Sequence, residues 1–421
     1  MDNAGMSLTE RLPHVKGLQC VICGADYSLD DVQYVCPGCG PVGVLDVIYD
    51  YASIAPERPT GGAASMWYRQ LAPLAADATL PALHIGGTPL YDAPRLGQPL
   101  GLSRLWVKDD GRNPTASFKD RASAMVVAHA QEIGVTTVAT ASTGNAAAAL
   151  AGVCAATPGV EATIFVPASA PEAKIAQLLV YGARVLLVEG TYDDAFDLCW
   201  TACEEFGWYN RSTGINPFTT EGKKTVSFEL AEQLNWQVPD VVVVSVGDGS
   251  IIGGVHKGFV DMLAMGWIDR IPRLIGIQAE GSSPLVYTWK NDLAAADMQP
   301  VDAHTVADSI SSGLPRDRAK ALRAVRETGG AYVSVTDDQI IAAIPELAQG
   351  VGVFAEPAGA TSYVGLKQAL AEGYIQPGEV VAILVTGNGL KDIRGAMQSV
   401  GQAQRVTPDL ESVRQALEAL D

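Results

Sequence analysis

The chain has 421 residues, of which 48% are hydrophobic, so it can bury at least one large core, and its length suggests two or three domains. Asp and Glu number 47 against 29 Lys and Arg, which gives a formal charge of -18 at pH 7. Such a charge repels nucleic acid and anionic membranes, and the longest apolar stretches are too short to span a bilayer. We therefore expect a globular protein without nucleic-acid or membrane partners.

The N-terminal segment has neither a basic segment followed by an apolar run nor a lipidation motif, so we expect a cytoplasmic protein with reduced thiols. Four of the seven cysteines have the spacing of a metal site: Cys20 and Cys23, twelve residues, then Cys36 and Cys39. Two CxxC turns can present four thiolates to one tetrahedral ion. We predict a zinc ribbon over residues 1–48 with a closed, structural site; buried or disulfide-paired cysteines are the alternative.

The middle of the chain alternates between two hydrophobic periods. Residues 50–114 are mixed, with a helix predicted around 65–74. Further helices are predicted over 120–133, 145–155, 172–181, 191–206, 223–234, 252–265, 337–349 and 358–372, and strands over 137–141, 162–166, 184–188, 240–246, 273–278 and 379–385. This alternation predicts an α/β fold with parallel sheets covered on both faces. Ligands in such folds bind beyond the carboxyl ends of the strands.

Three loops that follow predicted strands are therefore candidates for ligand binding. The segment STGN, residues 142–145, opens a helix and could seat a carboxylate or phosphate, although plain helix capping uses the same residues. The segment GDGSIIGG, residues 247–254, places backbone amides and a helix dipole where a phosphate could bind, without P-loop spacing. Thr386 ends an apolar strand and could donate one hydrogen bond.

Lys119 stands in the stretch NPTASFKDRAS, after a turn and an aromatic residue and before a helix. A solvated lysine on a helix surface is the ordinary interpretation. The three loops favour a catalytic lysine over a surface lysine, because together with an isolated amine they match the needs of one cofactor, pyridoxal 5'-phosphate. This cofactor needs a lysine for its Schiff base, a nest for its phosphate and a partner for its ring nitrogen.

Six segments carry a resemblance to a known family: NPTASFKDR, STGN, INPFTTEGKKT, VGDGSIIGG, FAEPAGA and VTGNGLKD. In this order, between Gly86 and Asp392, they resemble threonine synthases within the fold type II (tryptophan synthase beta-like) pyridoxal phosphate enzymes. The four-cysteine segment resembles one at the start of some threonine synthase-like chains. The resemblance implies two three-layer domains with parallel sheets after the ribbon: a large cofactor-binding domain of residues 49–111 and 221–405 and a small domain of residues 112–220. It also implies a C-terminal tail helix within 406–421 and favours a homodimer.

The resemblance also implies a role for each candidate residue. Lys119 would bind the cofactor covalently and, once freed, move protons at the substrate's carbon atoms, with Phe118 framing it. Asn145 would contact the cofactor's ring oxygen, and Thr386 would face the pyridine nitrogen. The substrate carboxylate would be held by Ser142 and Thr143, with Asn145 also contacting the substrate. The cofactor phosphate would be held by the backbone of Gly247, Asp248, Gly249, Ser250 and Ile251.

This chain departs from the family pattern around the lysine and in the phosphate loop. Ala116 and Ala122 replace small glycines, which narrows the space around Lys119 by two methyl groups. Asp248 stands where many relatives have asparagine. A carboxylate near a phosphate is unfavourable unless it points away or caps the next helix.

Thr219 bears most directly on the substrate, because many threonine synthases carry there an arginine that binds the substrate's phosphate. One hydroxyl is a weak replacement for a bidentate cation, and Lys223 or Lys224 could compensate unless they lie on a solvated helix face. We expect an enzyme acting on a small phosphorylated amino acid, first a threonine synthase that eliminates phosphate from O-phosphohomoserine and adds water. The alternatives are β-replacement or β-elimination on O-phosphoserine, serine or threonine, as in cysteate synthase-like or ammonia-lyase-like enzymes, and a noncatalytic zinc-ribbon binding protein.

Overall fold

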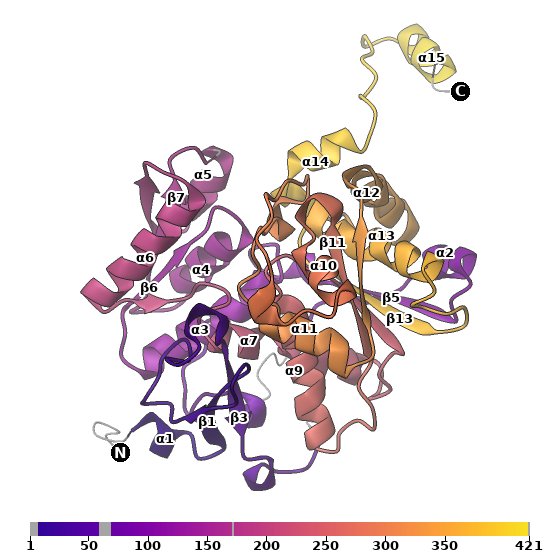
Figure 1. The fold of residues 1–421 in the computed structure, drawn as a ribbon. Coiled ribbons are helices and arrows are strands. Elements are labelled where there is room, and N and C mark those ends of the chain that lie inside the picture. The colour runs from indigo at the N-terminus through magenta and orange to yellow at the C-terminus, as the bar shows by residue number, and fades with distance from the viewer. Residues whose placement is uncertain (1–6, 59–68, 171, 420–421) are drawn as a thin grey trace.

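The computed structural model describes residues 7–58, 69–170 and 172–419. These residues form three sheets with strand orders β2-β1-β3, β12-β11-β10-β13-β5-β4 and β8-β7-β6-β9 (Figure 1). The first sheet is antiparallel, and the other two are parallel apart from the edge strand β4, which runs antiparallel to β5. The predicted α/β architecture, with two parallel-sheet units after a small N-terminal module, is confirmed.

The N-terminal module follows a short helix, α1 (Leu8–Arg11), and consists of β1 (Val15–Cys20), β2 (Asp26–Tyr27) and β3 (Leu45–Tyr49). Cys20 ends β1 and pairs in register with Leu45 of β3, so the first CxxC turn begins where the strand stops. The second CxxC turn leads into a 3-10 helix, η1 (Gly40–Val42), just before β3. Both turns therefore lie at the same end of the module.

The six-stranded sheet has helices on both faces. Its strands are β4 (Leu90–Asp92), β5 (Arg104–Asp109), β10 (Val241–Ser245), β11 (Arg273–Ala279), β12 (Ala331–Val335) and β13 (Val380–Val385). Alternate residues of β10 belong to two separate cores: Val242 and Val244 pack with α9 (Ser250–Ala264) and α11 (Arg318–Glu327). Val241 and Val243 pack with α12 (Asp337–Val351) and α13 (Pro357–Ala371). The period of two along a strand explains why its side chains are apolar throughout.

The four-stranded sheet consists of β6 (Thr137–Ala141), β7 (Glu161–Pro167), β8 (Arg184–Val188) and β9 (Tyr209–Asn210). Helices α3 (Lys119–Glu132), α4 (Asn145–Ala155) and α5 (Glu172–Val180) share a core with one face of this sheet. Helix α6 (Tyr192–Phe206) packs on the other face. In Figure 1 this sheet and its helices lie to the left of the six-stranded sheet, with α3 and α7 between them and the N-terminal module below.

The remaining elements connect or extend these layers. The helices are α2 (Pro94–Gly97), α7 (Phe218–Lys223), α8 (Thr225–Gln233), α10 (Pro284–Lys290), α14 (Ile393–Gln398) and α15 (Leu410–Glu418). The 3-10 helices are η2 (Tyr51–Ser53), η3 (Arg69–Leu71), η4 (Gln98–Leu100), η5 (Asp110–Arg112), η6 (Glu280–Ser282), η7 (Ala295–Asp297), η8 (Asp308–Ile310) and η9 (Gly389–Lys391). Within the described ranges, no helix is both long and apolar enough to cross a bilayer.

Several predicted elements differ from the structure. The helix predicted over 65–74 is wrong for its described part, since only 69–71 form a 3-10 turn, while 65–68 lie outside the described residues. The helix predicted over 223–234 corresponds to α8 (Thr225–Gln233), whereas the helix before it, α7, which follows Pro217 and begins at Phe218, was not predicted. The elements β5, α11 and β12 were not predicted at all. Charged residues in β5 and α11, such as Lys108 and Lys320, hide the apolar pattern although both are buried.

Candidate active site

Lys119 is the first residue of α3 and lies beside the end of β13. The amide of Phe118 donates a hydrogen bond to the carbonyl oxygen of Thr386 at 2.8 Å, and Ser117 pairs with Gly387 in an isolated bridge. The preceding residue Ala116 has φ of +66°, a left-handed conformation that favours glycine. These backbone contacts place the segment that carries Lys119 beside the end of β13, although the two are far apart in sequence.

A buried ion-pair network fixes the first turn of α3. Arg121 is fully buried and donates to the Asp110 carboxylate at 2.6 and 3.0 Å and to the Glu229 carboxylate at 2.5 and 2.8 Å. Lys108 at the end of β5 donates to the same Glu229 at 2.7 Å. Because these bonds tie α3 to β5 and α8, the backbone that carries Lys119 is held from two sides.

The amine of Lys119 lies in a charged environment. Its side chain is half-buried, and burial lowers its pKa from the ordinary lysine range. The negative charges of Glu356 and Asp248 oppose this shift, whereas the positive charge of Arg211 adds to it. A lysine with a lowered pKa is more often neutral, which is the form that reacts with a carbonyl group.

The loop between β10 and α9 presents an uncapped helix N-terminus. Gly249 at the N-cap has φ of +91°, and no described side chain caps the helix. The first amides of α9 are therefore available to an anion. The Asp248 carboxylate accepts a hydrogen bond from the backbone amide of Arg316 at 2.7 Å, and burial raises its pKa to about 6. Its side chain is thus engaged by the loop before α11.

The segment STGN begins α4 beyond the carboxyl end of β6. Ser142 and Thr143 are half-buried, and the Ser142 hydroxyl accepts a hydrogen bond from the Gly144 amide at 3.2 Å. The Asn145 side-chain amide donates to the Glu356 carboxylate at 2.9 and 3.1 Å. Glu356 belongs to the motif FAEPAGA but was not predicted as a site residue. It is buried, and burial raises its pKa.

The two lysines at the end of α7 are both buried, so neither lies on a solvated face. Lys224 forms ion pairs with Glu221 and Asp261 and donates to the Tyr49 hydroxyl. Lys223 has no hydrogen-bond partner for its Nζ atom within the described part of the chain. Lys223 alone of the two is therefore available to a ligand.

The remaining candidate, Thr219, uses its hydroxyl locally: it donates to the carbonyl oxygen of Asn216 at 2.8 Å. This bond closes the turn before α7. Arg211, which follows β9, is a second buried cation that was not predicted from the sequence. Its side chain is fully buried. Only its buried position distinguishes it from an ordinary surface arginine, and the sequence gives no signal of that.

The four cysteines of the N-terminal module converge. Their Sγ atoms all lie within 4.8 Å of one another, and the Tyr27 hydroxyl lies 3.1 Å from the Cys36 Sγ atom. The remaining cysteines, Cys154, Cys199 and Cys203, are buried in the two-sheet body. Four thiols at this spacing fit a tetrahedral ion.

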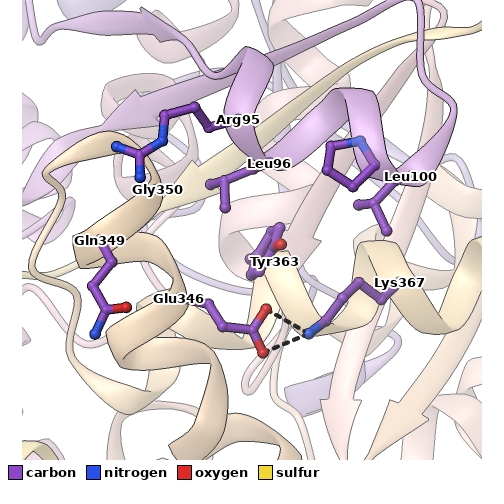
Figure 2. A pocket seen from close by; sticks show the side chains of 9 residues that line it. Arg95, Leu96, Leu100, Glu346, Gln349, Gly350, Tyr363 and Lys367 are labelled. Atoms are coloured by element: carbon purple, nitrogen blue, oxygen red, sulfur yellow. Dashed lines mark hydrogen bonds and ion pairs between the residues drawn. The ribbon is translucent and has the colours of Figure 1, made fainter. Parts of the chain in front are cut away.

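A surface pocket of about 410 Å³ lies elsewhere, between α2 and helices α12 and α13 (Figure 2). Arg95 and Leu96 line it from one side, and the Glu346–Lys367 ion pair lies on the other, with bonds of 2.9 and 2.8 Å. None of the predicted site residues lines this pocket.

The residues around Lys119 fit pyridoxal phosphate, because they combine an amine with a lowered pKa, an uncapped α9 N-terminus and buried cationic nitrogens without partners. The fold and this site define a pyridoxal phosphate enzyme. The family model described as pyridoxal-phosphate dependent enzyme matches residues 81–387, and the chain belongs to that family. It is a pyridoxal phosphate-dependent lyase.

Relatives named threonine synthase match nearly the whole chain. The one from Methanosarcina acetivorans is 41% identical over 404 residues, covering 95% of this chain and 98% of the relative. The one from Methanocaldococcus jannaschii is 38% identical over 409 residues, covering 96% and 99%. Among solved structures, processed threonine deaminase isoform 2 from Solanum lycopersicum has a TM-score of 0.63 at 23% identity, covering 75% of this chain and 88% of that one. This last likeness supports the fold only.

Proposed function

We propose that this enzyme converts O-phosphohomoserine and water into threonine and phosphate. The observation that carries the proposal is the similarity to relatives named threonine synthase, which extends over 95% and 96% of this chain. In this reaction the bond between the γ carbon and the phosphate oxygen breaks, and water supplies the hydroxyl group at the β carbon. When bound, pyridoxal phosphate supplies an electron sink for the negative charge that forms at the substrate's carbon atoms.

Lys119 has two roles in this proposal, attaching the cofactor and moving protons. Its lowered pKa keeps a larger fraction of the amine neutral, so it can accept a proton from the substrate's α carbon and return it. The Arg121 network holds α3 so that the amine stays in place. Phe118, bonded through its amide to Thr386, fixes the approach to the lysine.

Cofactor and substrate groups each have a proposed seat. The backbone of residues 247–251 binds the cofactor phosphate at the α9 N-terminus. Asn145, whose amide nitrogen donates to Glu356, would contact the ring oxygen of the bound cofactor, and Thr386 would contact its ring nitrogen. Ser142 and Thr143 hold the substrate carboxylate at the N-terminus of α4. The substrate phosphate lies near α7, which carries Thr219 and Lys223.

We also propose that Cys20, Cys23, Cys36 and Cys39 hold one structural zinc ion. All four positions are cysteines, so no open coordination site is left for catalysis. Metal analysis of a freshly reduced preparation should give about one zinc per chain. A preparation that is fully folded without metal would contradict this proposal.

The working assembly is proposed to be a cytoplasmic homodimer with the domain boundaries predicted from the sequence. Light scattering on the purified protein tests the dimer.

A second candidate reaction is β-replacement or β-elimination on O-phosphoserine, favoured by the absence of an arginine at position 219. The experiment is to offer O-phosphohomoserine, O-phosphoserine and threonine separately and to assay phosphate, keto acid and amino acid. Equal amounts of phosphate and threonine from O-phosphohomoserine are expected. Phosphate released only from O-phosphoserine would reject the proposed function in favour of β chemistry.

A further inference from the structure

Arg211 is a fully buried cation that is only partly satisfied. Its Nε atom donates to the Ser123 hydroxyl and its Nη1 atom to the Thr213 hydroxyl, both at 3.1 Å. Its Nη2 atom has no partner among the residues described. Neither hydroxyl carries a charge, so no acid bonds to this guanidinium. A buried donor left unpaired costs about 1–3 kcal/mol, and more when it is charged.

The position of Arg211 relates it to the catalytic lysine. Ser123 lies four residues after Lys119 on α3, so both face the same side of that helix. The Arg211 amide donates to the Ala139 carbonyl of β6, which fixes the arginine at the end of the four-stranded sheet. The guanidinium therefore lies beside the helix face that carries Lys119.

Lys223 approaches the same region from α7. The backbone of α7 meets α3 at Gly222, where an added Cβ atom would come within 2.1 Å of the Arg121 carbonyl oxygen. On its other side Lys223 packs on Gly254 in the second turn of α9. Burial lowers the pKa of Lys223 well below its ordinary range, and the positive charges of Arg211 and Lys119 lower it further. Asp317 and Asp248 oppose this shift without forming a hydrogen bond to its Nζ atom.

We propose that Arg211 and Lys223 together form the seat for the substrate's phosphate, in place of the arginine that many threonine synthases carry at position 219. The identity of the substrate rests on the proposed function. The ability of these two residues to bind an anion does not depend on it. Two unpartnered cationic nitrogens suit a phosphate dianion, which each can reach with a charge-assisted hydrogen bond. Thr219 cannot donate to this phosphate while its hydroxyl bonds to Asn216.

The cofactor also carries a phosphate, so the same chemistry has two sources. The uncapped amides of α9 already offer the cofactor phosphate a seat. Arg211 comes instead from the four-stranded sheet and reaches α3 one turn beyond Lys119. The substrate's phosphate lies close to the reacting carbon atoms, whereas the cofactor's phosphate does not. We therefore assign Arg211 to the substrate's phosphate.

The test measures binding without turnover, using holoenzyme and the phosphonate analogue of O-phosphohomoserine, in which a methylene replaces the ester oxygen. Calorimetry is run on wild type, Arg211→Lys, Lys223→Met and the surface control Arg184→Gln, whose arginine pairs with Glu161 on an exposed strand. We expect each of the two seat variants to bind about 10- to 100-fold more weakly, as for the loss of hydrogen bonds to charged groups. The control should bind as wild type does. Thermal melts confirm that each variant is folded.

Separate outcomes identify which claim fails. Wild-type affinity in both seat variants would overturn the inference, whatever the reaction. If the variants lose affinity for pyridoxal phosphate on reconstitution but keep affinity for the phosphonate, the two cations serve the cofactor and the inference is also wrong. If wild type yields no threonine from O-phosphohomoserine, yet phosphonate binding depends on both residues, the proposed function fails and the seat stands.

Discussion

Two groups of charged side chains near helix α7, buried except for the half-buried Lys119, differ in whether their charges have bonded partners. The first, which we call the paired cluster, consists of Tyr49, Glu221, Lys224, Lys257 and Asp261, and its lysines bond directly to carboxylates. The second, the cleft cluster, consists of Lys119, Arg211 and Lys223. Within the described residues, no carboxylate bonds to Arg211 or Lys223.

The comparison is sharpest at Lys223 and Lys224, which are neighbours in sequence and equally buried. Lys224 bonds to Tyr49 of β3 and Asp261 of α9, and these bonds hold both elements against the end of α7. In the free protein the charged form of Lys223 is unfavourable, because burial desolvates that charge and no partner compensates for it. A cost of this kind is typical of a binding site, where the ligand supplies the missing charge. The bonds of the paired cluster hold the fold together, and we propose that the cleft cluster binds the substrate.

The largest effect is expected for Lys119→Ala. Loss of the amine removes both cofactor attachment and proton transfer, so activity should fall by about 10³-fold or more. The visible absorption band of the lysine-bound cofactor should vanish while the circular dichroism spectrum stays that of a folded protein. A variant that keeps the band would show that another residue holds the cofactor.

Next in size is the contrast between Lys224→Met and Lys223→Met, measured as free energies of unfolding of the apoprotein. Lys224→Met leaves Glu221 and Asp261 buried with fewer cations, and should destabilise by about 3–5 kcal/mol. Lys223→Met removes a buried amine that has no hydrogen-bond partner, and should leave the free energy of unfolding unchanged or higher. Equal destabilisation by both substitutions would remove the distinction between the clusters.

A smaller effect concerns protons. An anion at Lys223 favours its charged form, so binding should raise its lowered pKa and take up a proton. Affinity for sulfate should then fall as pH rises, by at most about tenfold per pH unit for one linked proton. Calorimetry of the holoenzyme above pH 7, in buffers of different ionisation heat, measures the uptake. The pKa of Asp248, about 6, keeps that carboxyl ionised there, and Arg211 and Asp317 are the other charged neighbours.

The matching control for the proton measurement is Lys223→Met, which should bind sulfate weakly and without uptake. Proton uptake that persists in this variant would show that a group other than Lys223 binds the proton. Lys223 would then have no evidence for a role in anion binding.

The smallest effect is expected for Ala116→Gly. Ala116 has φ of +66° in the turn that leads into Lys119, and its carbonyl oxygen accepts a bond from the Asn388 amide. A left-handed conformation costs an L-residue about 1–2 kcal/mol, part of which glycine's greater freedom when unfolded cancels. The variant should therefore be more stable by about 1 kcal/mol or less. Chemical denaturation measures this difference, and a loss of stability would show that the alanine methyl group packs favourably.

Features that depend on short sequence motifs could be predicted, whereas features that depend on contacts between distant residues could not. The CxxC spacing gave the convergence of Cys20 and Cys39, and the setting of Lys119 pointed to a reactive amine. The Asn145–Glu356 contact joins residues 211 positions apart, so no local pattern predicts it. Arg211 follows a strand of only two residues and carries no motif. Its burial depends on α3 and β6 packing around it.

The most direct measurement is a crystal structure of the holoenzyme with the phosphonate analogue bound. We predict phosphonate oxygens within hydrogen-bond distance of the Lys223 Nζ atom and the Arg211 Nη2 atom, with the Lys224 ion pairs unchanged. A phosphonate bound away from both nitrogens would contradict the account, because the cleft cluster would then have no ligand to satisfy it.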